Sequence, residues 1–241
     1  MGPSSIVKQP TYAGGAFAVL AAACVTGVLA SRSVQVSIAG VETIGSLLLL
    51  GSGVVRRRGY RVLGGSLVVG GSGIVCLALG LSFLAPGGPF ERLSFLGGTV
   101  AMACVVLGVF PLYRSWTRPL VGIGVALFSC SLVGLAWATN IGGPRLLLGV
   151  GLTIVTWDVA EHAITLGDDV GRSARTYTVS VTHLAGSLGV GLAAGTVAVA
   201  VSSVQLPPIP IAALALLLGA FLLLLFVLFL GDSEWLSGRR D

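Results

Sequence analysis

The sequence predicts an all-α integral membrane protein, a single polytopic bundle of about eight transmembrane helices over residues 1–241. The chain is 55% hydrophobic and only 10% charged, whereas soluble domains spend about a quarter of their residues on charge. The apolar residues also form long blocks, close to the roughly 20 residues that an α-helix needs to cross a bilayer. A transmembrane β-barrel would instead show alternating segments of about ten residues.

Segments rich in Gly, Pro and charge separate the apolar blocks, because these residues end helices. The predicted spans are 12–31, 34–55, 61–84, 93–113, 119–139, 146–166, 180–204 and 209–230. A cleaved signal peptide is an alternative for the first block, since "VLAS" places small residues at its end. Its apolar stretch is longer than the roughly 7–15 residues of such a signal, so we favour a retained span.

A weak internal repeat is visible in the two halves of the chain. "LGGSLVVG" begins at Leu63 and "LAGSLGVG" begins at Leu184, each at the start of the second helix of a pair. A tandem duplication of four helices, residues 1–116 and 117–241, would explain this as it does in some transporters. Chance recurrence in a chain with 36 glycines explains it too, and is favoured.

The distribution of basic residues predicts the orientation in the cell membrane. With a cytoplasmic N-terminus, eleven Lys and Arg residues lie inside and three lie outside, namely Arg32, Arg92 and Arg145. Such a bias is typical of multi-pass proteins and places both termini in the cytoplasm. The net charge of +5 then reflects topology and excludes a nucleic-acid partner.

One dense basic cluster follows the second span. It consists of Arg56, Arg57, Arg58 and Arg61. A role in fixing topology is the simpler interpretation, and contact with anionic lipid is the alternative.

The sixth span carries the polar stretch "TIVTWDVAEHAITLGDD", which is the main candidate site. Residues three and four apart share a helix face, so a stripe is predicted from Asp158, Glu161, His162 and Thr165. Asp158 lies about 18 Å along the span by helical rise, past the centre of a core roughly 30 Å thick. An unpaired charge there costs at least about 2.5–3.5 kcal/mol, so the stripe is expected to face protein or water.

Two further polar residues are candidate members of the same site. His183 begins the seventh span at the level of the stripe, and Glu42 lies about 12 Å into the second span. The seventh span also has a seam of small residues suited to close packing.

Three interpretations of these residues remain open. A proton or ion relay would use carboxylates and histidines in this way. A metal site would use Asp158, His162 and His183, but HExxH is absent and no metal or cofactor is expected. In a purely structural role, the stripe bonds neighbouring helices and its acids pair with Arg172 or Arg175. No P-loop, nucleotide fingerprint or nucleophile elbow is present, so no enzymatic activity is predicted.

The stretch "TWDVAEHAITLGDDVGR" followed by "THLAGSLGVG" resembles a family of uncharacterised multi-pass membrane proteins from halophilic archaea. The resemblance rests on Trp157, Asp158, Glu161, the Leu166–Gly167 pair and the Gly-rich seventh span. It implies a membrane component that works with a MoxR-type ATPase system. We therefore expect a non-enzymatic accessory or scaffold subunit. A small proton- or ion-coupled transporter that uses the stripe is the alternative.

Overall fold

Seven helices long and apolar enough to cross a membrane are present in the described part of the chain. The computed structural model describes residues 9–110, 114–139, 142–172 and 176–202. The chain divides into two units, residues 1–198 and 199–241, and the account below concerns the first. The membrane-protein class is supported by length and composition, and the eighth predicted span, 209–230, lies outside the described residues.

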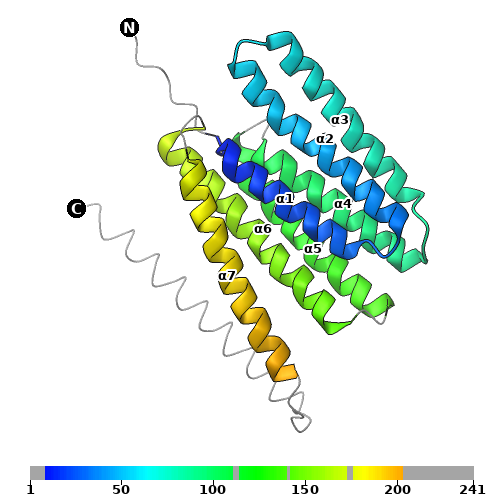
Figure 1. Cartoon of the computed structure of the whole chain (residues 1–241). Coiled ribbons are helices and arrows are strands. Elements are labelled where there is room, and N and C mark those ends of the chain that lie inside the picture. Colours follow the sequence, from blue (N-terminus) through cyan, green and yellow to red (C-terminus); the bar gives the residue numbers. More distant parts are fainter. Residues whose placement is uncertain (1–8, 111–113, 140–141, 173–175, 203–241) are drawn as a thin grey trace. The chain divides into compact units, whose positions relative to one another are not determined.

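The helices follow the predicted apolar blocks in order (Figure 1). They are α1 (Tyr12–Leu29), α2 (Ser33–Arg57), α3 (Arg61–Phe83), α4 (Pro89–Val109), α5 (Thr117–Ala138), α6 (Gly143–Val170) and α7 (Tyr177–Ser202), with a short 3-10 turn, η1 (Arg114–Trp116), before α5.

Helix ends are where the structure departs from the predicted spans. The fourth span was predicted to begin at residue 93, but α4 begins at Pro89. Proline suits the first helical turn because it lacks an N–H, and the Gly88 N–H donates to Glu91 Oε2 at 3.3 Å. The helix α6 has 28 residues and continues past the predicted end at 166, through Asp168 and Asp169. Polar residues beyond an apolar span are compatible with helix, so hydropathy alone places such ends too early.

The helix α1 lies at the centre of the bundle. Figure 1 shows it between α2 and α6, and it also packs against α4. The strongest pairings elsewhere join α2 to α3 and α4 to α5, as expected for neighbours linked by short connections. Ala18, Val25 and Leu29 of α1 are fully buried in the main apolar core. The apolar core of the bundle is therefore built around α1.

Glycine allows α2 and α3 to cross closely. A Cβ atom added at Gly71 would lie 2.8 Å from the Gly45 carbonyl oxygen, and one added at Gly45 would lie 3.0 Å from the Gly71 carbonyl oxygen. Small residues at these positions let the backbones approach, as is usual for membrane helices.

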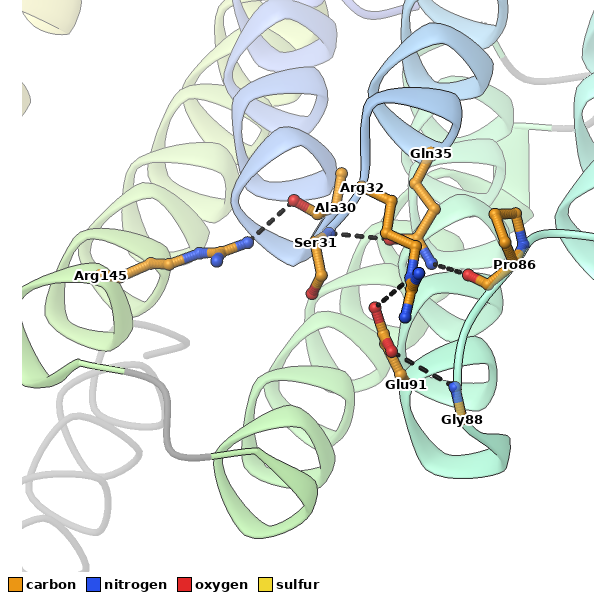
Figure 2. Close-up of polar contacts among 8 residues, drawn as sticks. All are labelled: Ala30, Ser31, Arg32, Gln35, Pro86, Gly88, Glu91 and Arg145. Atoms are coloured by element: carbon orange, nitrogen blue, oxygen red, sulfur yellow. Dashed lines mark hydrogen bonds and ion pairs between the residues drawn. The ribbon is translucent and has the colours of Figure 1, made fainter.

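A polar network closes one end of the bundle (Figure 2). The amide of Gln35 accepts from the Ser31 N–H at 2.7 Å and donates to the Pro86 carbonyl at 3.1 Å. Arg145 of α6 donates to the carbonyls of Val28 and Ala30 at the end of α1. Figure 2 also shows Arg32 beside Glu91, at an N–O distance of 3.4 Å. Two of the three arginines predicted at this end therefore tie helices together.

Candidate functional site

Asp158 joins α6 to α7. Its Oδ2 atom accepts a hydrogen bond from the Ser187 hydroxyl and lies 2.9 Å from His183 Nε2. The second contact has an ion-pair distance, although His183 Nε2 does not make an aligned hydrogen bond. The pairing with His183 agrees with the sequence-based expectation. The carboxylate therefore contacts protein, and it faces α7 rather than the buried centre of the bundle.

His162 and His183 form a stacked pair beside this carboxylate. Their ring centroids are 3.9 Å apart and the ring planes differ by 12°. An imidazole N–H lies in the plane of its ring, so two rings stacked face to face do not hydrogen-bond to each other. His162 Nε2 is buried and has no hydrogen-bond partner among the described residues. The stack therefore packs α6 against α7 but does not extend a hydrogen-bonded path.

The remaining stripe residues on α6 point elsewhere. Glu161 pairs with Arg118 of α5, with 2.7 Å between Oε1 and Nε, and Thr165 is exposed. The sequence predicted that Glu161 pairs with Arg172 or Arg175, but its partner is Arg118. Arg172 instead donates to Gln9, and Arg175 lies outside the described residues. Arg118 could have been suspected, because it lies at the start of α5, the helix before α6, at the end of the bundle where α6 finishes.

Glu42 is separate from this cluster. It is fully buried on α2, which packs against α3, α1 and α4. Neither carboxyl oxygen has a hydrogen-bond partner among the described residues. The predicted common polar path from Glu42 to Asp158 therefore has no contact that supports it in this part of the chain.

A groove of about 720 Å³ lies between α6 and α7. Its walls are mostly apolar, with Val150, Ile154 and Trp157 on α6 and small residues on α7. Asp158, His183 and Ser187 form its polar part. Trp157, which departs from the usual interfacial position of tryptophan, is 52% exposed and also borders a second groove of about 390 Å³ between α5 and α6.

The basic cluster is separate from the groove, because none of its arginines lines the groove. All four are exposed around the α2–α3 connection, namely Arg56, Arg57, Arg58 and Arg61.

No group of three or more His, Cys, Asp or Glu side chains with a geometry suited to a metal ion is found among the described residues. The groove between α6 and α7 therefore offers an apolar surface for packing, and Asp158, His183 and Ser187 offer polar groups within the membrane helices.

The family of the chain follows from its sequence over most of these helices. A family model with the description "Family of unknown function (DUF7519)" matches residues 71–225. The chain belongs to this family. The DUF7519 match contains α6, α7 and their groove, whereas Glu42 and the basic cluster precede it. No curated protein and no solved structure matches the chain.

Proposed function

We propose that this DUF7519 protein is a non-enzymatic accessory or scaffold subunit that binds a transmembrane helix of a partner protein in the groove between α6 and α7. The observation that carries the proposal is the exposure of α7. No residue in its most apolar 18-residue window is buried, whereas about half of the corresponding α1 window is. The described residues thus leave most of α7 uncovered, and such a surface on a spanning helix is suited to association with another helix.

The shape of the groove favours a helix as its occupant. Gly191, Gly195 and Ala198 line the α7 wall at intervals of four and three residues, so they share one helix face. Small residues in this spacing permit close backbone approach between membrane helices. The opposite wall supplies larger side chains, Val150 and Ile154, that can pack against the side chains of an incoming helix.

The polar part of the groove suggests the chemistry of the partner. Both contacts made by Asp158 go to Oδ2, and the side chain remains 40% exposed. Its Oδ1 atom is thus available to a donor from outside the described residues. A partly exposed carboxylate in a spanning helix is costly, so we expect the partner helix to carry a Lys, Arg or hydrogen-bond donor at this depth.

The cellular setting is part of the same proposal. The excess of arginine at the end where α1 begins favours a cytoplasmic location for that end, in the cell membrane. The resemblance to haloarchaeal partners of MoxR-type ATPase clusters makes a membrane component of such a system the expected partner.

Photo-crosslinking in native membranes tests the helix-binding role. A benzoylphenylalanine placed at Gly191 should give an adduct with a transmembrane helix of another protein, and one at Gly189 should not. Gly189 is the matched control because it is on α7, has open space around it and does not line the groove. An adduct with a second copy of this chain, or with lipid only, would refute the proposal.

A blocking substitution gives an independent measurement. Gly191→Leu would fill the groove, since the nearest atom to an added Cβ is Val155 Cγ2 at 4.0 Å. Co-purification of the partner identified by crosslinking should fall with Gly191→Leu and stay unchanged with Gly189→Leu, both measured without the crosslinking residue. Equal recovery with both variants would place the partner elsewhere.

A proton- or ion-coupled carrier is the second candidate, and the 2.9 Å contact between Asp158 and His183 favours it. The stacked histidines and the separation of Glu42 favour the scaffold instead. Reconstituted vesicles distinguish the two. A carrier would show flux under a proton or ion gradient that Asp158→Asn abolishes, and a scaffold would show none.

A further inference from the structure

The connection between α2 and α3 concentrates positive charge at one end of the bundle. Between Glu42 and Glu91 the sequence contains four arginines and no acidic residue. Arg56 and Arg57 end α2, Arg61 begins α3, and Arg58 lies in the tight turn between them, where Gly59 has φ +93°. All four are exposed. The turn keeps their guanidinium groups within a short stretch of surface.

A second segment, distant in sequence, adds another guanidinium to this place. Arg172, from the connection after α6, lies over the Tyr12 ring with 4.4 Å between its Cζ atom and the ring centroid. Arg57 lies over the same ring at 5.5 Å. Tyr12 begins α1, so three parts of the chain meet at one aromatic side chain.

The positive charge at Tyr12 is not neutralised by a carboxylate of the described residues. Neither Arg57 nor Arg172 forms an ion pair there. The Nε atom of Arg172 is buried without an acceptor. Burial lowers the pKa of the Arg172 guanidinium, the phenol of Tyr12 raises it, and the charge of Arg57 lowers it again. An anion beside Arg57 would relieve the repulsion between the two cations.

We propose that Arg57, supported by Arg172 and Tyr12, binds the phosphate headgroup of an anionic phospholipid. A guanidinium can donate two parallel hydrogen bonds to phosphate oxygens, and the exposed Arg57 is accessible for this contact. Arg58 and Arg61 contribute further positive charge beside it. Basic clusters directly next to a spanning helix typically attract anionic lipids, and aromatic residues such as Tyr12 are common at the same depth.

The proposal differs from a role in topology alone. Topology is set during membrane insertion, whereas a lipid site persists in the folded protein. The inference is also independent of the helix-binding groove, which is formed by α6 and α7. A purified protein can therefore distinguish a lasting lipid site from residues that only oriented the chain.

Native mass spectrometry of the full-length protein in detergent provides the test. The protein is titrated with phosphatidylglycerol and, separately, with phosphatidylcholine of the same acyl chains. We expect tighter retention of phosphatidylglycerol and a loss of about fivefold in its affinity for Arg57→Gln, the effect expected for one interfacial arginine. Arg57→Lys keeps the charge but not the two-pronged donor, so its affinity should fall between those of the wild type and Arg57→Gln.

Arg92→Gln is the matched control, because Arg92 is an exposed arginine near the start of α4, at the opposite end of the bundle. It should retain phosphatidylglycerol like the wild type. Equal retention of the two lipids, or equal losses for Arg57→Gln and Arg92→Gln, would overturn the proposal. Displacement of the lipid by an equal concentration of inorganic phosphate would show a site for free phosphate instead.

Discussion

Asp158 of α6 and His183 of α7 lie 2.9 Å apart, measured from Oδ2 to Nε2. Ser187, one turn further along α7, donates to the same carboxylate oxygen. These contacts and the stacking of His162 on His183 are the polar links between two helices that otherwise border an open groove. The carboxylate of Asp158 therefore helps to hold α7 in place, together with the ring contact between Phe17 of α1 and Tyr177 of α7.

Asp158→Ala should destabilise the folded protein, because it removes both contacts to α7. Hydrogen bonds between membrane helices contribute on average about 0.6 kcal/mol and at most about 1.7 kcal/mol each. We expect the free energy of unfolding to fall by about 1–2 kcal/mol in titrations with sodium dodecyl sulfate in mixed micelles.

Thr165→Ala supplies the control for this measurement, since Thr165 is an exposed polar residue on the same helix. It should unfold like the wild type. If Asp158→Ala also unfolds like the wild type, the contacts to His183 and Ser187 do not hold α7 in place.

The ion pair between Arg118 and Glu161 should contribute little, despite its short distance of 2.7 Å. The two side chains are 59% and 36% exposed, and exposed pairs typically contribute about 0–1 kcal/mol. A double-mutant cycle with Arg118→Gln and Glu161→Gln should give a coupling energy below about 1 kcal/mol that falls with added salt. A larger coupling that is insensitive to salt would show that the pair is shielded from solvent.

Seven of the predicted spans correspond to helices, because hydropathy and helix-breaking residues determine where the helices of a membrane protein lie. The apolar blocks and the Gly and Pro residues between them are local features of the sequence. Helix ends such as Pro89 were missed because they depend on capping and on polar residues beyond the apolar core.

The candidate site was predictable only where two helices follow each other in the chain. Asp158 and His183 lie on α6 and α7, and the short connection between these helices predicts that they are neighbours. Glu42 could not be assigned in this way, because the packing of α2 against α3, α1 and α4 is not encoded in any local pattern. The sequence suggested Arg172 for Glu161, whereas Arg118 of the preceding helix α5 is the partner, because adjacency in the chain does not select between two arginines at the same end of the bundle.

Gly71→Ala should destabilise the crossing of α2 and α3, and Gly70→Ala should not. A Cβ at Gly71 would lie 2.8 Å from the Gly45 carbonyl oxygen, whereas nothing lies within 4 Å of one at Gly70. Overpacking of this kind costs typically about 1–3 kcal/mol, and alanine otherwise favours helix by up to about 1 kcal/mol over glycine. Thermal unfolding of the two variants checks the contrast. Equal melting temperatures would mean that α2 and α3 move apart to accommodate the added methyl group without a loss of stability.

Glu42→Met should raise the stability of the protein. Both carboxyl oxygens of Glu42 are buried without a partner among the described residues, and an unsatisfied buried polar group costs about 1–3 kcal/mol. Gln35→Met on the same helix is the opposite case, since the buried Gln35 amide is bonded to Ser31 and Pro86. It should lower the free energy of unfolding by a similar amount. A loss of stability in Glu42→Met would reveal a partner for this carboxyl group beyond the described residues.

Arg145→Gln should loosen the end of α1. The guanidinium donates to the Val28 carbonyl at 2.7 Å and to the Ala30 carbonyl at 2.8 Å (Figure 2 shows the second contact). The last carbonyls of a helix have no partner within the helix, and a cation there also interacts favourably with the helix dipole. We expect a loss of about 1–2 kcal/mol in the free energy of unfolding, and faster amide hydrogen exchange in the last turn of α1.

Two variants sharpen this last measurement. Arg145→Lys keeps the charge but reaches fewer carbonyls, so its stability should lie between those of the wild type and Arg145→Gln. Arg92→Gln removes an exposed arginine at the same end of the bundle and should leave exchange in α1 unchanged. If Arg92→Gln accelerates exchange as much as Arg145→Gln does, the stabilisation comes from the general positive potential rather than from the two carbonyl contacts.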